Sequence, residues 1–521
     1  MGGMEGKLPA ISDAERTPLV ERLLAIIDAE RAKSQKLEGE KEKVESEKEK
    51  LEGEKKRLEA ELNRFRKRLA QYEPEVWYEG KRTETASETD RPSPSYSMGA
   101  EEKRRRGRRR RKKKSPGRRP TEVKFADAKD VRDAYPDGID PSDCQLVRER
   151  AVWRLEDGKA VLVGYRVFAG PGGVEGRIPS VTPRCEYGIE ILVVLTFLVY
   201  IIGISLDKSC AVLGFFCGLR ISKSQADALL RQLARHWDAE YDTLCELIAH
   251  AAVVYMDETG WKVGVEGCSL WAFASQLHRV FLFGCRKDDA TLDQMLPPDV
   301  FAGIGVSDDA HVYRDRFKQG QKCWAHLLRK LIRLALLYPR KKTYQRLLDE
   351  LLALYRDAKR AAADERLGVE GRKQRVAEFE GRLCQLWQPF WPAETTPDMK
   401  PHERDFANFI DEVMRLCLAE ELFTFVLQPE LVDPTNNISE RQLRDPALAR
   451  KAGRTNKTPK GAHRQSVIVS VLQSLRANLA QFTLSSVLEE VTHWMHDGIS
   501  LFAKQWQKLK AAQPTFEPNT S

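Results

Sequence analysis

Two short apolar runs, each followed by an aspartate, constrain the fold of this 521-residue chain more than any other feature. The first run is Ala251–Met256, which precedes Asp257, and the second is Phe301–Val306, which precedes Ser307 and Asp308. Runs of this length and composition are typical of buried β-strands. Neighbouring strands lie about 4.8 Å apart, so two parallel strands that end in this way would place their carboxylates side by side. We therefore expect a buried sheet with an acidic site at its carboxyl edge.

The residues around these runs predict the rest of an α/β unit. Ser269–Ala274 and Val280–Gly284 are spaced like further strands of a meander, and Ala290–Met295 is expected to be a helix. Four downstream segments have the apolar spacing of helices, namely Leu327–Leu337, Thr343–Ala363, Gln374–Trp387 and Phe406–Leu418.

A third carboxylate stands far downstream, at Glu440. Asn437 and Ser439 precede it and are residue types that cap helices, so Glu440 is expected in the first two turns of a helix. Arg441 and Arg444 follow and would either contact DNA phosphate or orient the carboxylate. The alternative is an exposed capped helix in which Glu440 pairs with Arg444. Three carboxylates without a thiolate are the oxygen ligands that Mg²⁺ or Mn²⁺ prefers.

The positive charge of the chain is concentrated in one place. The net charge is +9, yet the stretch 103–119 alone carries thirteen Lys and Arg and no acid, so the remaining residues together carry −4, the difference between +9 and +13. A local run of this kind most often binds a polyanion, and its phosphate contacts would be independent of sequence. The expected contacts are Lys103, Arg104, Arg105, Arg106, Arg108, Arg109, Arg110, Arg111, Lys112, Lys113 and Lys114.

Two other segments have helical patterns with two interpretations each. Apolar residues recur every seven positions at Leu37, Val44, Leu51, Leu58 and Phe65, but Lys fills most of the companion positions, so a coiled coil competes with a solvated single helix. Leu206–Cys217, a turn at 218–221 and Ser222–Trp237 resemble a helix-turn-helix with Lys223 and Gln225 at the start of the second helix. The alternative there is an ordinary helical hairpin.

Several classes of protein are excluded by composition. The ten cysteines include no CxxC pair, which argues against a disulfide framework and a zinc finger and fits reduced thiols in a cytoplasm. The N-terminus lacks the apolar region of a signal peptide. The apolar run Ile191–Ile204 is shorter than the roughly twenty residues that span a membrane. We therefore expect it to be a buried helix or strand.

Taken together, several motifs resemble the transposases of the insertion sequence 66 family over about residues 140–500. The motifs are Asp257-Glu-Thr-Gly-Trp261, Val306-Ser-Asp308 with Tyr313, Cys323-Trp-Ala-His326-Leu-Leu-Arg329, Asn436-Asn-Ile-Ser-Glu440-Arg441 and Arg450-Lys451. The resemblance implies an α/β fold with an RNase H-like catalytic core. It also implies an all-helical insertion in the 132-residue gap between Asp308 and Glu440, a preceding helical DNA-binding region and an N-terminal coiled coil.

The resemblance implies a domain order along the chain. We expect a coiled coil over 14–72, a disordered basic linker over 73–120, a small β-rich domain over 121–187, a helix-turn-helix-like region over 188–248, the first part of the core over 249–326, the insertion over 327–430, the second part of the core over 431–500 and a tail over 501–521.

It also implies an activity. Asp257, Asp308 and Glu440 would be the catalytic metal ligands of a DDE transposase that uses Mg²⁺, or Mn²⁺ as a substitute. Its partners would be DNA, as element ends and target, and at least a second copy of the chain in a bacterial cytoplasm, on the nucleoid; a need for accessory proteins stays open. The alternatives are a host nuclease with the same core and a DNA-binding regulator derived from a transposase.

Three points stay open within the resemblance. Trp261 would either stack on an unpaired base or pack in the core. Asp309 follows Asp308, where another residue type is usual in the family, and the spacing to Tyr313 favours Asp308 as the ligand. Cys323 and His326 form half of a zinc site or a signature that stabilises the fold, and we expect no zinc because structural zinc takes four ligands. The family's Cys-rich segment is reduced here to Cys144 and Cys185.

Overall fold

The computed structural model describes residues 39, 119–391, 396 and 398–512. The chain divides into two units, Met1–Pro116 and Gly117–Ser521, and the fold described below is that of the second. The coiled coil over 14–72, apart from Gly39, and the basic run Lys103–Lys114 lie outside the described residues and stay predictions.

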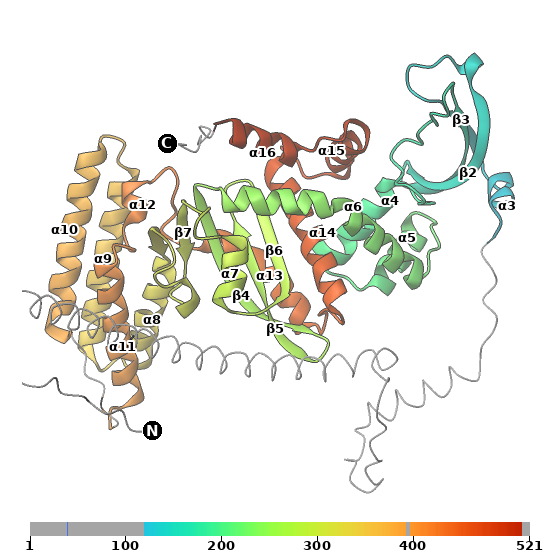
Figure 1. Cartoon of the computed structure of the whole chain (residues 1–521). Coiled ribbons are helices and arrows are strands. Elements are labelled where there is room, and N and C mark those ends of the chain that lie inside the picture. The colour runs from blue at the N-terminus through green and yellow to red at the C-terminus, as the bar shows by residue number, and fades with distance from the viewer. Residues whose placement is uncertain (1–38, 40–118, 392–395, 397, 513–521) are drawn as a thin grey trace, which may run out of the picture. The chain divides into compact units, whose positions relative to one another are not determined.

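A five-stranded mixed sheet forms the centre of this unit (Figure 1). Its strands are β4 (Val253–Val263), β5 (Glu266–Ala274), β6 (Arg279–Cys285), β7 (Ile304–Ser307) and β8 (Gln319–Lys322), in the spatial order β6-β5-β4-β7-β8. β4, β5 and β6 are antiparallel, whereas β7 is parallel to β4 and β8 is parallel to β7. β8 was not expected from the sequence, since Gln-Gly-Gln-Lys offers no apolar residue to indicate a strand.

Helices cover both faces of the sheet because side chains alternate along each strand. On one face, Val254 and Met256 of β4 join the core around α6 (Lys223–Ala249) and α7 (Asp289–Met295). On the other face, Val253 and Tyr255 join the core of the helical insertion. Farther along β4, Trp261 packs with residues of α13 (Asn437–Lys451) and α14 (Pro459–Asn478).

Between β8 and α13 lies a group of helices with its own apolar core, which is called the helical insertion here after its place in the chain. The helices are α8 (Trp324–Leu337), α9 (Lys342–Ala363), α10 (Val369–Trp387), α11 (Pro401–Leu418) and the short α12 (Thr424–Leu427). The apolar spacing predicted the first four, and their last residues are those expected from the sequence. A strong amphipathic pattern indicates the position of such helices in the sequence, because the apolar stripe of each helix must be buried.

Residues 119–187 contain a small three-stranded sheet. After α3 (Thr121–Ala126) come β1 (Asp130–Ala134), β2 (Gln145–Glu156) and β3 (Lys159–Ala169), in the spatial order β1-β3-β2. Asp157 and Gly158 connect β2 to β3 with φ angles of 48° and 74°. A two-residue hairpin turn needs positive φ at both positions, which an Asp-Gly pair tolerates.

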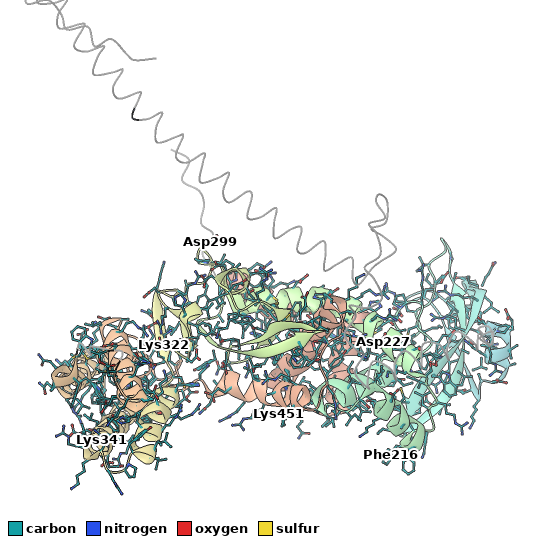
Figure 2. All side chains as sticks on the ribbon, turned by 90° about the horizontal axis from the view of Figure 1, so that it is seen from below. Phe216, Asp227, Asp299, Lys322, Lys341 and Lys451 are labelled. Atoms are coloured by element: carbon teal, nitrogen blue, oxygen red, sulfur yellow. The ribbon has the colours of Figure 1, made fainter. Side chains whose placement is uncertain are left out.

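The following segment is helical, as expected. α4 (Ile189–Thr196) continues into a π-helix, η4 (Phe197–Ile201), and α5 (Leu206–Phe216) leads to α6. Phe216 at the end of α5 is exposed (Figure 2). The apolar run Ile191–Ile204 lies largely within α4 and η4, and among the described helices none is long and apolar enough to cross a membrane.

The C-terminal region differs from the predicted tail. α15 (Leu484–Asp497) is followed by α16 (Leu501–Ala512), which packs against α6. Phe502 is fully buried, and Gln505 Oε1 lies 2.9 Å from His278 Nε2. The prediction of a tail over 501–521 was therefore wrong for residues 501–512, because a few apolar side chains anchor this short helix to the core.

The outer edge of the sheet, at β6, is closed by hydroxyl groups rather than by another strand. Three serines spaced one turn apart on α14 accept hydrogen bonds from backbone N–H groups of β6, each at 2.9 Å. The pairs are Ser466 with Phe283, Ser470 with Phe281 and Ser474 with Arg279. An open strand edge invites pairing with other chains, so these serines both satisfy and cover the edge.

We expect Ser470→Ala to lower the free energy of unfolding by about 1–3 kcal/mol, since the buried N–H of Phe281 would lose its acceptor. Urea denaturation followed by circular dichroism measures the change. Ser485→Ala, at an exposed position of α15, is the control and should change stability by less than about 0.5 kcal/mol. Equal effects of the two substitutions would contradict the role of the serine ladder.

Candidate active site

The register between β4 and β7 brings two aspartates together. Val253 pairs with Ile304, and Tyr255 pairs with Val306, in a parallel ladder. Continuing this register by two residues places Asp257 level with Asp308. The sequence predicted that both strands end at these residues, but β4 continues to Val263 because residues 258–263 still pair with β5. Only the parallel neighbour, β7, ends at this level, and its end leaves the Asp257 side chain without a neighbouring strand on that side.

The alternation of side chains separates Asp257 from the adjacent Glu258. The Glu258 side chain is only 6% exposed, and its carboxylate accepts a hydrogen bond from the Tyr313 hydroxyl and pairs with Lys287. Tyr313 belongs to the core on the α6 side of the sheet, which is the face opposite to Val253 and Tyr255. Asp257 therefore points to the face that α13 covers, whereas Glu258 is held on the other face.

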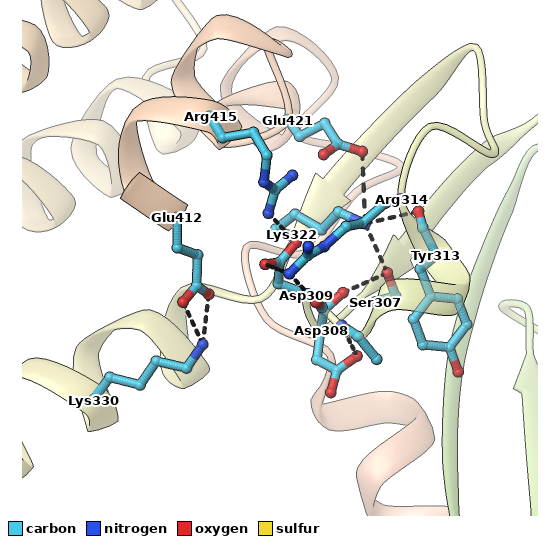
Figure 3. A network of polar contacts seen from close by, with 11 residues as sticks. Ser307, Asp308, Asp309, Tyr313, Arg314, Lys322, Lys330, Glu412, Arg415 and Glu421 are labelled. Carbon is cyan, nitrogen blue, oxygen red and sulfur yellow. Dashed lines mark hydrogen bonds and ion pairs between the residues drawn. The ribbon is translucent and has the colours of Figure 1, made fainter. Parts of the chain in front are cut away.

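The next pair of acids, Asp308 and Asp309, is separated by ion pairing (Figure 3). Asp308 Oδ1 accepts a hydrogen bond from the backbone N–H of Ala310 at 3.0 Å. Asp309 is 6% exposed and pairs with Arg314, at 3.0 Å, and with Arg415 of α11. Two guanidinium groups thus occupy the Asp309 carboxylate, which favours Asp308 as the acid available for a ligand.

A buried lysine forms hydrogen bonds with the loop that carries Asp308 (Figure 3). Lys322 of β8 is 1% exposed, and its Nζ donates to Ser307 Oγ at 3.3 Å and to the Tyr313 carbonyl at 3.1 Å. Glu421 Oε1 lies 3.6 Å from the same Nζ and balances its charge. No local sequence pattern predicts this network, because its members come from distant elements. It ties the loop to β8 and to the helical insertion.

The third acid is positioned by a buried asparagine at the start of α13. The Asn436 side chain is fully buried, and its Nδ2 donates to the Met256 carbonyl of β4 at 2.7 Å. Its Oδ1 accepts from Ser439 Oγ at 2.6 Å. The sequence predicted a side-chain cap, but Asn436 makes no capping hydrogen bond and instead fastens α13 to the residue before Asp257. Glu440 follows one turn later.

The charges of the other acids act on Asp257. The pKa of Asp257 is raised to about 7, mainly by burial and next by the charge of Asp308, with smaller contributions from Glu258 and Glu440. Among the described residues, Asp257 and Asp308 have no basic partner within ion-pair distance. Their carboxylate oxygens are ligands of the kind that a hard divalent ion such as Mg²⁺ prefers. Glu440 lies farther off, because the ligand atoms of Asp257, Asp308 and Glu440 do not all lie within 4.8 Å of one another.

Glu440 has two basic neighbours on α8. Arg329 lies 3.3 Å and His326 Nδ1 lies 3.6 Å from its carboxylate, so Arg329 rather than Arg444 pairs with it. Ligand atoms of Cys323, His326 and Glu440 all lie within 4.8 Å of one another. However, burial raises the pKa of the Cys323 thiol, and Cys323 Sγ accepts the backbone N–H of Asn436 at 3.2 Å. Cys323 thus has a structural role at the start of α13, and three ligands are one fewer than a closed zinc site uses.

The other residues singled out in the sequence lie apart from this cluster or are occupied. Trp261 is 2% exposed, and its Nε1 donates to Asn456 Oδ1 at 2.7 Å, so its ring has no free face for a base. Gln225 forms a capping box with Ser222 at the start of α6. Lys223 is exposed and pairs with Asp207 at 3.1 Å. Arg441 and Arg444 are exposed on α13.

The raised pKa of Asp257 predicts a pH-dependent effect of Asp257→Asn in EDTA. The folded protein binds this proton up to about pH 7, whereas an unfolded Asp releases it near pH 4. The contribution of Asp257 to the free energy of unfolding therefore falls as pH rises from about 4 to about 7. The variant should gain stability over the wild type between pH 5 and pH 8, on the order of 2 kcal/mol.

Urea denaturation at the two pH values measures this difference. Asp299→Asn, at an exposed aspartate (Figure 2), is the control and should show no such pH-dependent gain. A stability difference between Asp257→Asn and wild type that is constant across this range would rule out the raised pKa.

Comparison with known families places this site in context. The model of the Transposase IS66 family matches residues 184–464, more than half of the 521 residues, and the match includes Asp257, Asp308 and Glu440. No curated protein has a sequence that matches the chain. On the strength of the family match, this chain belongs to the IS66 family of transposases.

Proposed function

We propose that this chain is a DDE transposase that cleaves the ends of an insertion sequence and joins the resulting 3′-OH to target DNA. The observations that support the proposal are the parallel register that sets Asp257 level with Asp308 and the hydrogen bond that fastens the start of α13, which carries Glu440, to the residue before Asp257. Membership of a transposase family supports the same conclusion. The sheet order, with three antiparallel strands and two parallel ones and an insertion before the third acid, supports an RNase H-like core.

The three carboxylates would hold Mg²⁺, or Mn²⁺ as a substitute. When bound, two such ions lower the pKa of the attacking water and stabilise the leaving 3′ oxygen. Asp257 and Asp308 would supply oxygen ligands from the sheet, and Asn436 fastens the start of the helix that carries Glu440 to the residue before Asp257. Exposed Arg441 and Arg444 follow Glu440 on α13 and would hold the phosphates that flank the cleaved bond.

DNA and a second copy of the chain are the proposed partners. The basic run Lys103–Lys114 would add sequence-independent phosphate contacts. Because transposition joins two element ends, at least two protomers would act together, and the heptads from Leu37 to Phe65 are a candidate contact. Trp261 and Gln225 are not proposed as DNA contacts, since both side chains have partners within the fold.

The proposed roles of the acids and the metal can be tested by substitution and by exchange of the metal ion. Asp257→Asn, Asp308→Asn and Glu440→Gln should each lower the rate of element-end cleavage by more than about 100-fold, because loss of groups outside the ligand shell already costs about 10–100-fold. Binding to the same DNA in Ca²⁺ should persist. The wild type should cleave in Mg²⁺ or Mn²⁺, but hardly in Ca²⁺, whose coordination is longer and looser.

A radiolabelled element end incubated with purified protein provides the measurement. Asp299→Asn serves as the matched control and should cleave like the wild type. Cleavage that persists in EDTA would refute the metal mechanism. Metal-dependent cleavage without preference for element ends would favour the host nuclease, and binding without cleavage would favour the regulator.

The proposed positioning role of Asn436 can be tested in the same way. Asn436→Ala removes the hydrogen bond to the Met256 carbonyl and should lower the free energy of unfolding by about 1–3 kcal/mol. It should also slow cleavage by about 10–100-fold, because Glu440 would lose its fixed position. Asn437→Ala, at the exposed neighbouring residue, is the control. A folded Asn436→Ala protein that cleaves at the wild-type rate would contradict this positioning role.

A further inference from the structure

The segment that follows Glu440 is strongly basic. Residues 441–476 contain nine Lys and Arg but a single acid, Asp445. Most of these basic side chains are exposed and, among the described residues, have no ion-pair partner: Arg441, Arg444, Lys451, Arg454, Lys457 and Lys460. Lys451, on α13, is labelled in Figure 2. A helix pair that only completed the core would not need this excess of unpaired charge.

Two adjoining cavities lie along these residues. The larger has a volume of about 710 Å³ and lies among η4, α13 and the start of α14. The smaller has a volume of about 310 Å³ and lies between α13 and the later part of α14. Gln442, Asp445 and Gln473 line both cavities. The two cavities therefore form one continuous groove, here called the α13–α14 groove.

The α13–α14 groove combines cations with an apolar wall. Arg441 and Arg476 line its smaller part, and Arg454 and Lys457 line its larger part. The larger part is also walled by aromatic and aliphatic side chains, among them Tyr200, Ile201, Phe281, Phe283 and Leu448. Arg464, at the same wall, pairs with Asp227 at 2.7 Å, yet its Nε is buried without a hydrogen-bond partner.

α13 places this groove next to the acidic cluster. Arg450 donates to Thr259 Oγ1 at 3.0 Å, so the helix runs along β4 beyond Asp257. At about 100° per residue, Glu440 and Gln442 lie on opposite flanks of α13, with Arg441 between them. The acids and the groove are thus two sides of one helix, and an extended anion that crosses Arg441 would reach both.

We propose that the α13–α14 groove binds an unpaired stretch of one DNA strand next to the cleavage site, with phosphates on its cations and a base in the larger cavity. The inference deepens the proposed function and rests on DNA being the substrate. The cations line both parts of the groove instead of converging on one point, which fits a polyanion. An apolar cavity accepts a base only outside a duplex stack, and aromatic walls with basic edges are typical of single-strand sites.

The first test measures binding of the full chain in Ca²⁺, where cleavage is not expected. The probes are a duplex with a single-stranded 3′ tail and a blunt duplex of the same sequence, so that their affinity ratio cancels contacts common to both. The variant R454Q/K457Q/R476Q should lower the preference for the tail by about 10-fold. The slope of log K against log salt for the tailed probe should fall by about two units, at about 0.7 per lost contact with a single strand.

The matched control is R340Q/K342Q/R346Q, which removes the same charge from exposed positions outside the groove. This control variant should leave the affinity ratio of the tailed to the blunt probe unchanged. It should also leave the difference between the salt slopes of the two probes unchanged. If groove and control variants affect the tailed probe alike, the proposal is overturned, because only overall charge would then matter.

A second variant tests the cavity without changing charge. Ala449→Trp places an indole in the larger cavity and should lower the tail preference by about 10-fold, as for the loss of one stacked base. Binding to the blunt duplex should stay within about twofold. Ala239→Trp, at an exposed position of α6, is the control, and thermal melting verifies that both variants fold.

Two outcomes would distinguish a failure of this inference from a failure of the proposed function. Equal weakening of tailed and blunt DNA by R454Q/K457Q/R476Q, with no effect of Ala449→Trp, would mean that the groove binds duplex DNA and would overturn the unpaired strand. A tail preference that depends on Arg454, Lys457 and Ala449 in a chain that never cleaves DNA would support the groove and refute the transposase activity alone.

Discussion

The parallel pairing of β4 with β7 is the contact on which the rest of the site depends. It brings Asp257 level with Asp308, and it can do so because β7 ends at Ser307 while β4 continues along β5. A shift of one residue would turn Asp257 to the opposite face, where Glu258 now bonds to Tyr313. The choice between two adjacent acids is therefore made by strand register, and no property of either side chain alone would decide it.

Burial and the nearby charge of Asp308 both disfavour the charged form of Asp257 when no cation is bound, and the raised pKa of Asp257 reflects that cost. The surrounding structure keeps the cluster together by contacts that do not use the acids themselves. Asn436 donates a hydrogen bond that fastens α13 to the Met256 carbonyl. Lys322 donates a hydrogen bond to Ser307, the residue before Asp308. Asp309 and Arg415 join this loop to α11. The helical insertion, which lies between Asp308 and Glu440 in the sequence, thus also helps to hold the Asp308 loop in place.

The sequence predicted those parts of the fold that have a local signal. The insertion helices were found to the residue at their C-terminal ends, because each must bury one apolar stripe. The apolar runs before Asp257 and Asp308 indicated β4 and β7. What local patterns could not predict was β8, which is polar, and the anchoring roles of Asn436, Asp309 and Lys322, which depend on partners up to 180 residues away. Trp261 shows the same limit, since only Asn456 and the neighbouring core decide that its ring is enclosed.

α13 shows how one short helix can serve several demands at once. Leu443 and Pro446 face the core, and Arg450 bonds to β4, so this side fixes the position of the helix. Glu440 projects from one flank, and Gln442, Asp445 and Ala449 line the groove on the other. Arg441 and Leu448, which also line the groove, are the exposed residues at its rim. A helix with this division of faces has little apolar surface to hold it in place, which explains why its N-terminus depends on a buried asparagine and its C-terminal side on the Gly264–Asn456 backbone hydrogen bond.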